Sequence, residues 1–87
     1  MFIATGIEEN PELAVRMFPN PATDKVNITG IGQQPVNLEI FDVKGLPVMR
    51  IDQFDGQQIN LKDLPEGVYF IKLQNDEMNI TRKLVIR

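Results

Sequence analysis

Apolar residues recur at every second position in short runs along this chain, and this alternation constrains its fold more than any other feature. Residues 36–40 and 69–73 are two such runs, in which Val, Leu, Ile or Tyr alternates with other side chains. A period of two places successive side chains on opposite faces of a strand, whereas no stretch of about 11 residues has the period of a helix. The sequence therefore predicts a protein built from strands.

Turn signals divide these runs into seven strands. Asp42-Val43-Lys44-Gly45 is typical of a tight turn, and Pro47 places the next run at a sheet edge or at a strand start. A spacing of about 8–12 residues predicts an all-β fold, namely a seven-stranded immunoglobulin-like antiparallel β-sandwich. Strands two and five should share one sheet, and strands three, six and seven the other. The strands are expected near residues 13–17, 26–28, 36–41, 46–52, 57–61, 68–74 and 78–86.

Two prolines flank an asparagine just before the second strand, in Phe18-Pro19-Asn20-Pro21. Each proline fixes its own φ near about −65° and favours extended geometry in the residue before it. This segment is therefore a stiff, non-helical corner. Asn20, Thr23 and Asp24 can hydrogen-bond the backbone groups that are freed there.

A tyrosine follows a glycine by two residues in Leu64-Pro65-Glu66-Gly67-Val68-Tyr69. This pattern is typical of a tyrosine corner, in which the phenol hydroxyl bonds backbone a few residues upstream. The alternative is a plain loop followed by a core tyrosine. Gly67 is expected to have a positive φ.

The length of 87 residues suits one domain with a modest core. Residues 1–12 mix small, polar and acidic types without a period, so they are interpreted as a linker, and residues 13–87 as the domain. The first residues include no basic segment followed by a long apolar run. If the chain is exported, its N-terminal signal is expected elsewhere, in a longer polypeptide.

Composition argues against catalysis. The chain contains no cysteine and no histidine, so neither a thiolate zinc site nor the usual nucleophile–base pair can be assembled. Asp52 and Asp55 lie close in sequence, but they lack the dense oxygen ligands that calcium needs. We expect no catalytic residue, metal or cofactor. A net charge of −3 disfavours nucleic acid as a partner.

The two outward faces of the expected sandwich differ in character. The face with strands two and five is uniformly polar. The other face should carry an apolar patch, which suggests docking, although a linker or a neighbouring domain could cover it and a weak homodimer stays open. By strand parity this patch consists of Phe41, Phe70 and Val85, edged by Lys72, Lys83 and Arg87.

Four motifs in order resemble a known family, the type A C-terminal sorting domains of the type IX secretion system, over about residues 16–87. The opening motif is Phe18-Pro19-Asn20-Pro21-Ala22, and a strand and turn follow that end at Gly45. Next come Ile59-Asn60-Leu61 and the block with Gly67 and Tyr69. The last motif is Thr81-Arg82-Lys83-Leu84-Val85.

The resemblance implies a folded secretion signal that is attached to an upstream cargo domain. It implies periplasmic transit, then export to the cell surface or the medium by the outer-membrane secretion machinery. It also implies cleavage by a sortase-like surface enzyme, in or before residues 1–12. The residues expected to be recognised by the machinery are Lys83, Leu84, Val85 and Arg87.

Two other classes of function remain in view. One is a fibronectin type III-like binding or spacer module appended to an extracellular enzyme, because that class shares the tyrosine-corner pattern. The other is an enzyme, for which the sequence offers no catalytic constellation. Export of a fused passenger separates a sorting signal from a spacer, and turnover by the isolated domain would indicate an enzyme.

Overall fold

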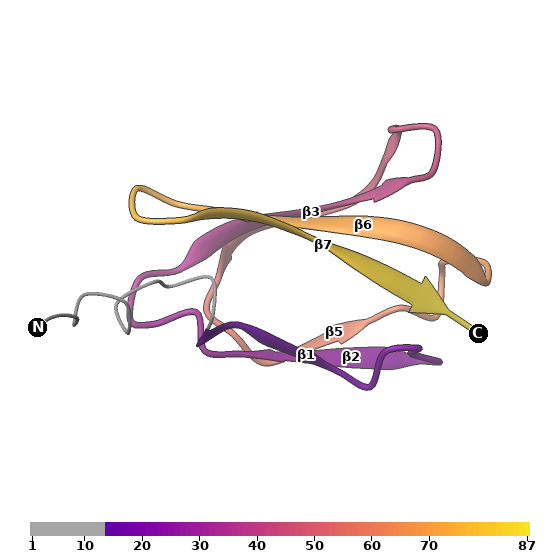
Figure 1. Ribbon diagram of the computed structural model, residues 1–87, viewed down its shortest axis with the longest axis horizontal. Coiled ribbons are helices and arrows are strands. Elements are labelled where there is room, and N and C mark those ends of the chain that lie inside the picture. The colour runs from indigo at the N-terminus through magenta and orange to yellow at the C-terminus, as the bar shows by residue number, and fades with distance from the viewer. Residues whose placement is uncertain (1–13) are drawn as a thin grey trace, which may run out of the picture.

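The structure, a computed structural model, describes residues 14–87, and every regular element named in that range is a strand (Figure 1). The expected linker at residues 1–12 lies outside the described residues. No helix among residues 14–87 is long and apolar enough to span a membrane. The seven strands are β1 (Arg16–Phe18), β2 (Lys25–Thr29), β3 (Val36–Asp42), β4 (Pro47–Phe54), β5 (Gln58–Asn60), β6 (Gly67–Gln74) and β7 (Asn79–Ile86).

The strands form two antiparallel sheets that lie face to face (Figure 1). One sheet has the order β1-β2-β5, and the other has the order β4-β3-β6-β7. The predicted all-β sandwich is therefore confirmed, as is the division that puts strands two and five in one sheet and strands three, six and seven in the other. β4 and β7 are the edges of the larger sheet.

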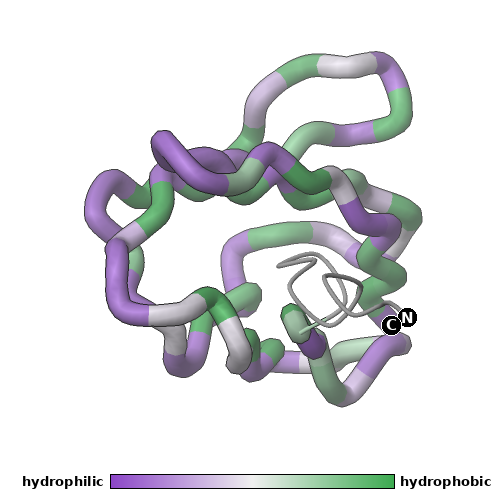
Figure 2. Tube along the Cα trace, turned by 60° about the vertical axis from the view of Figure 1, so that its left-hand side comes forward, coloured by the Kyte–Doolittle hydropathy of each residue, from purple (hydrophilic) through white to green (hydrophobic). Residues whose placement is uncertain are grey.

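The core lies between the sheets and follows from the alternation in the sequence. In β6, Tyr69, Ile71 and Leu73 are buried, whereas Phe70 between them is exposed. Apolar and polar segments accordingly alternate at short intervals along the trace in Figure 2. No polar or charged side chain among residues 14–87 is classed as buried. The core is thus an ordinary apolar interior without a buried reactive group in the described part of the chain.

The fourth strand differs from its predicted bounds. It begins at Pro47, as a proline at a strand start should, but it extends to Phe54, two residues beyond the predicted end at residue 52. A shift of register against β3 separates the pairs Val36–Phe54 and Leu38–Ile51, and Gln53 within it has a φ of 59°. This irregularity turns the Phe54 side chain into the core, because an extra residue in one strand reverses its parity.

Candidate recognition surface

The proline corner connects the two sheets. The chain leaves β1 at Phe18 and reaches the outer edge of β7, where Ala22 forms an isolated parallel bridge with Ile86. The Ala22 amide donates to the Val85 carbonyl oxygen at 2.7 Å, and the Arg87 amide donates to the Ala22 carbonyl oxygen at 2.8 Å. The Phe18–Pro19 and Asn20–Pro21 peptide bonds are both cis. The corner thus supplies a short pairing partner for the free edge of β7.

The Asn20 side chain adds two more bonds to the same edge. Its Nδ2 donates to the Lys83 carbonyl oxygen at 2.9 Å, and its Oδ1 accepts from the Val85 amide at 3.0 Å. The sequence had suggested that Asn20 bonds backbone groups freed within the corner itself. Instead, its partners lie 63 and 65 positions further along the chain.

The other side of the corner is fastened to the smaller sheet. Asn27 Nδ2 donates to the Phe18 carbonyl oxygen at 3.2 Å, and Gln58 Nε2 donates to Asn27 Oδ1 at 3.3 Å. Asn27 lies on β2 and Gln58 on β5, so side chains of two strands of this sheet contribute to the position of the corner.

The last strand presents alternate residues to solvent and to the core. Lys83 and Arg87 are exposed and Val85 is half-buried, whereas Leu84 and Ile86 are buried. Leu84 has no exposed surface, so a partner of the folded domain cannot touch its side chain. Of the four residues expected to be recognised, three are therefore accessible. Leu84 is a core residue that stabilises the fold.

Three strands bring the expected apolar patch together. Register places Phe41 of β3 beside Phe70 of β6, and Phe70 beside Lys83 of β7. Two residues along, and on the same face, Val68 pairs with Val85. Phe70 is 39% exposed and Val68 is 36% exposed, whereas Phe41 is half-buried. The outward face of the larger sheet therefore has an apolar end with Lys83 directly beside it.

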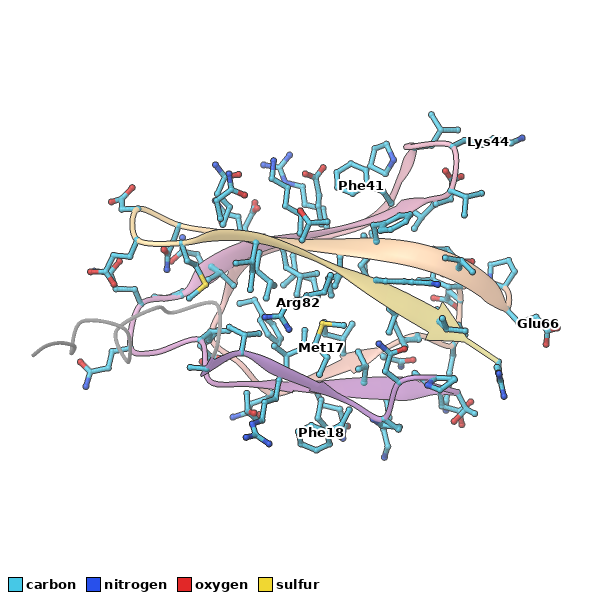
Figure 3. The ribbon with its side chains drawn as sticks, viewed as in Figure 1. Met17, Phe18, Phe41, Lys44, Glu66 and Arg82 are labelled. Carbon is cyan, nitrogen blue, oxygen red and sulfur yellow. The ribbon has the colours of Figure 1, made fainter. Side chains whose placement is uncertain are left out.

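The apolar area continues onto the hairpin between β3 and β4, which the sequence analysis did not include. Val43 and Leu46 in its turn are 67% and 58% exposed, and Val48 is exposed beside them. The Asp42 carboxylate holds the turn by accepting from the Lys44 amide at 2.8 Å and from the Leu46 amide. Figure 1 shows this hairpin projecting beyond the sandwich, and Figure 3 places Phe41 and Lys44 along it.

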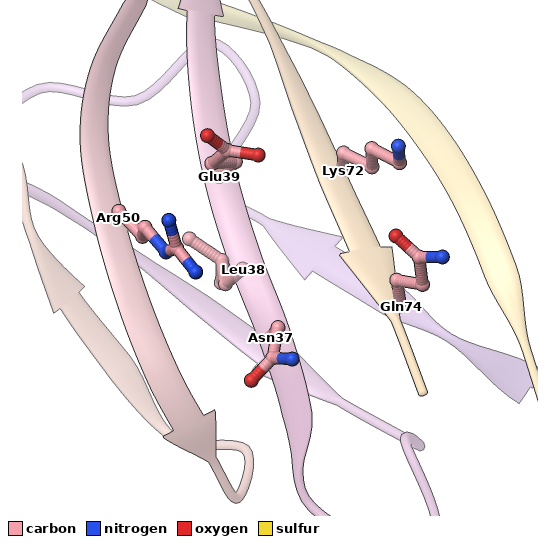
Figure 4. A pocket seen from close by; sticks show the side chains of 6 residues that line it. All are labelled: Asn37, Leu38, Glu39, Arg50, Lys72 and Gln74. Carbon is pink, nitrogen blue, oxygen red and sulfur yellow. The ribbon is translucent and has the colours of Figure 1, made fainter. Parts of the chain in front are cut away.

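The middle of the same face is charged. Glu39 of β3 pairs in register with Arg50 of β4 on one side and with Lys72 of β6 on the other. Figure 4 shows these side chains over a shallow hollow that is also lined by Asn37 and Gln74. Lys72 was expected at the rim of the patch, and it lies one row from Phe70 with an acidic neighbour. It therefore marks the boundary between the apolar end and a charged row.

The sequence analysis gave Arg82 no role beyond its place in the last motif. Its parity is that of the core-facing residues Leu84 and Ile80, and Figure 3 shows it between the two sheets near Met17. Its Nη1 donates to the Val15 carbonyl oxygen at 3.4 Å. A long cationic side chain at an inward position close to the sandwich edge can bury its stem and keep its head bonded.

The tyrosine corner predicted from the sequence is present. The Tyr69 hydroxyl donates to the Pro65 carbonyl oxygen at 2.6 Å, and the ring is buried. Gly67 has a φ of 154°, within the positive region where glycine is favoured, and Gly45 in the β3–β4 turn has a φ of 86°. These two glycines therefore occupy positions where a side chain would strain the backbone.

Acidic side chains do not converge in the described range. No three of its Asp or Glu residues are placed to hold a metal ion. Asp52 instead accepts from Arg50 Nε at 3.2 Å, and both side chains are well exposed. Such a surface pair contributes little to stability.

The model of the family described as secretion system C-terminal sorting domain matches residues 16–87. This chain belongs to the C-terminal sorting domains of the type IX secretion system. It is also 33% identical over 88 residues to a protein named endo-acting ulvan lyase from Formosa agariphila, an alignment that covers 94% of this chain. The chain spans 17% of the length of that relative. The family match favours the sorting signal over the spacer module.

Family membership gives the domain its role. A C-terminal sorting domain is a secretion signal within a cargo polypeptide that the type IX system sorts, and its destination is the cell surface or the medium. The sorting domain is not itself the catalytic part of such a polypeptide. The matched segment contains all four motifs noted in the sequence, from the proline corner to the last strand.

Proposed function

We propose that the secretion machinery recognises this domain through the outward side chains of β7 and the apolar end of the larger sheet. The observation that carries this proposal is the parity of β7. Lys83 and Val85 of β7 share one face and Arg87, directly after the strand, is exposed, while the residues between them complete the core. The strand that closes the fold also presents the side chains through which it is recognised.

The chemistry of the face indicates the chemistry of the partner. Phe70 and Val68 offer desolvated contact area, and Lys83 lies directly beside Phe70. A complementary surface would place apolar side chains over these residues and a carboxylate opposite Lys83, since interfaces combine an apolar centre with a polar rim. Such a partner is the outer-membrane secretion machinery.

The polypeptide around the domain follows from the same proposal. The relative is named as a lyase, and this chain spans 17% of its length. This similarity supports an extracellular enzyme as the cargo of this domain too. The cargo crosses the periplasm and is released from the domain at the cell surface by a sortase-like enzyme. Cleavage falls in or before residues 1–12, upstream of the folded unit.

Export of a reporter fused before the domain tests this function in a host with a type IX system. Lys83→Glu should abolish or strongly reduce export, because it places an anion where the partner carries one. Lys25→Glu is the matched control, since Lys25 is exposed on β2 in the opposite sheet and the change in net charge is equal. Equal export of the two variants would contradict the proposal.

The apolar contribution has its own matched pair in the same assay. Phe70→Gln removes an exposed ring from the proposed surface, whereas Thr29→Gln places the same amide side chain at an exposed position of β2 in the smaller sheet. Export should fall for the first and persist for the second. Deletion of residues 83–87 is a poor test, because it also removes buried Leu84 and Ile86 and would unfold the domain.

A further inference from the structure

The backbone of the three proposed recognition residues is itself occupied. The bonds from the proline corner end on the Lys83 carbonyl, on the Val85 amide and carbonyl, and on the Arg87 amide. These four groups form the outer edge of the terminal half of β7 and of the residue that follows it. An exposed strand edge is a common site at which a partner adds a strand of its own.

Asn20 and Ala22 together take the place of such an added strand. Ala22 pairs through its amide and carbonyl, as a strand residue does, while Asn20 uses its side-chain amide both to donate and to accept. Ala22 is fully buried, so separating it from β7 would expose apolar surface as well as break hydrogen bonds. A partner strand would first have to replace these hydrogen bonds and this burial before its own contacts added any net binding energy.

The bonds also orient the proposed recognition surface. Side chains of a strand leave it perpendicular to the direction of its backbone bonds, so fixing the edge of residues 83–87 fixes the directions of Lys83, Val85 and Arg87. A surface that is ordered before binding loses less conformational freedom when it binds. Holding the edge therefore favours recognition through the outward face.

We propose that the proline corner is a clasp that stays closed on β7 during recognition, with Asn20 as a positioning residue. This inference rests on the proposed function and deepens it. The secretion machinery then contacts β7 through side chains on the sheet face, and it does not add a strand at residues 83–87. The corner and the last strand act as one unit of the signal although the chain between them is more than 60 residues long.

A reversible cross-link tests whether the clasp remains closed. Ala22 and Ile86 are bridge partners, so their Cα atoms lie about 5 Å apart, within the range that a disulfide spans. The chain has no cysteine of its own, so the Ala22→Cys, Ile86→Cys pair forms a single defined bond. Ile86→Cys alone is the control for the core volume lost at that position, and the reduced double variant is the control for the sulfur added at buried Ala22. Alkylation and gel mobility give the cross-linked fraction in each compartment.

A clasp that stays closed and an edge that the machinery must open predict opposite results for the reporter fusion. If the clasp stays closed, cross-linked molecules are exported at the level of the Ile86→Cys control. If the machinery must open the edge, cross-linked molecules are retained, and adding a reductant restores their export. The second result would overturn the proposal. It would leave the proposed function intact. The proposed function fails separately if the Lys83→Glu and Lys25→Glu fusions are exported at equal levels.

Asn20→Ala provides an independent test that does not depend on forming a disulfide. Its control is Asn27→Ala, which removes a side-chain bond to the same corner from the opposite sheet. In Asn20→Ala, hydrogen exchange at the Val85 amide should quicken by about threefold to tenfold, while amides in the centre of β6 keep their rates. Export should fall relative to Asn27→Ala, because the outward side chains of residues 83–87 lose a bond that fixes their directions before binding. Unchanged export, despite faster exchange at Val85, would refute a positioning role.

Discussion

Gly30 and Gly32 offer a matched comparison of two glycines with the same backbone conformation. Their φ values are 82° and 84°, so replacing either by alanine carries a similar conformational cost of about 1–2 kcal/mol. Their surroundings differ. A Cβ at Gly32 would have no heavy atom within 4 Å, whereas a Cβ at Gly30 would overlap the Ala14 carbonyl oxygen and lie 2.7 Å from its carbonyl carbon.

Relieving that overlap requires the backbone of residues 14–15 to move. Val15 is 4% exposed in the core, and its carbonyl oxygen accepts from Arg82 of β7. Overpacking of this kind costs about 1–3 kcal/mol. Gly30→Ala should therefore lower the free energy of unfolding by about 2–5 kcal/mol, and Gly32→Ala by about 1–2 kcal/mol.

Thermal and urea unfolding of the isolated domain measure this difference. For a domain of this size 1 kcal/mol corresponds to about 4–8 °C, so the melting temperature of Gly30→Ala should lie at least about 4 °C below that of Gly32→Ala. Equal losses in the two variants would refute the reasoning, because they would show that the close approach of Ala14 has no energetic consequence.

Substitutions at two further positions address the tyrosine corner and the last strand. Tyr69→Phe keeps the buried ring and removes the bond to Pro65, so the free energy of unfolding should fall by about 0.5–1.5 kcal/mol in urea titrations; a wild-type midpoint would contradict the tyrosine corner. Leu84→Ala should lower it by about 2–5 kcal/mol, whereas Leu84→Met should cost less than about 1.5 kcal/mol and leave reporter export intact. Loss of export in a stable Leu84→Met variant would indicate that Leu84 is recognised directly.

Parity and turn chemistry explain why much of the fold was predictable. The alternation in β6 and β7 assigns Tyr69 and Leu84 to the core and Phe70 and Lys83 to the surface, because a strand offers two faces and one is buried. The Gly67–Tyr69 spacing predicted a bond that spans four residues, which is a local interaction. Local rules therefore sufficed wherever partners were close in sequence.

The features that sequence reasoning missed depend on distant partners or on a local break in the pattern. Nothing near Asn20 indicates that its amide bonds the strand around Lys83, since the pairing arises only when the sandwich has closed. Phe54 fell outside the strand that was predicted to end at residue 52, because the alternation of period two does not continue through the irregularity at Gln53. For the bonds of Asn20, the available signal was an asparagine between two prolines. That signal predicted a corner, but it did not predict that the corner pairs with β7.

The long separation between the corner and β7 has a consequence for biosynthesis. Until β7 has been synthesised, β6 has an open edge and Asn20 and Ala22 have no partner. A ribosome that stalls within the domain would therefore release a chain without an assembled signal, however well its cargo had folded. Such a dependence would confine export to polypeptides translated through residues 79–87, and the secretion pathway would need no separate inspection for truncated products.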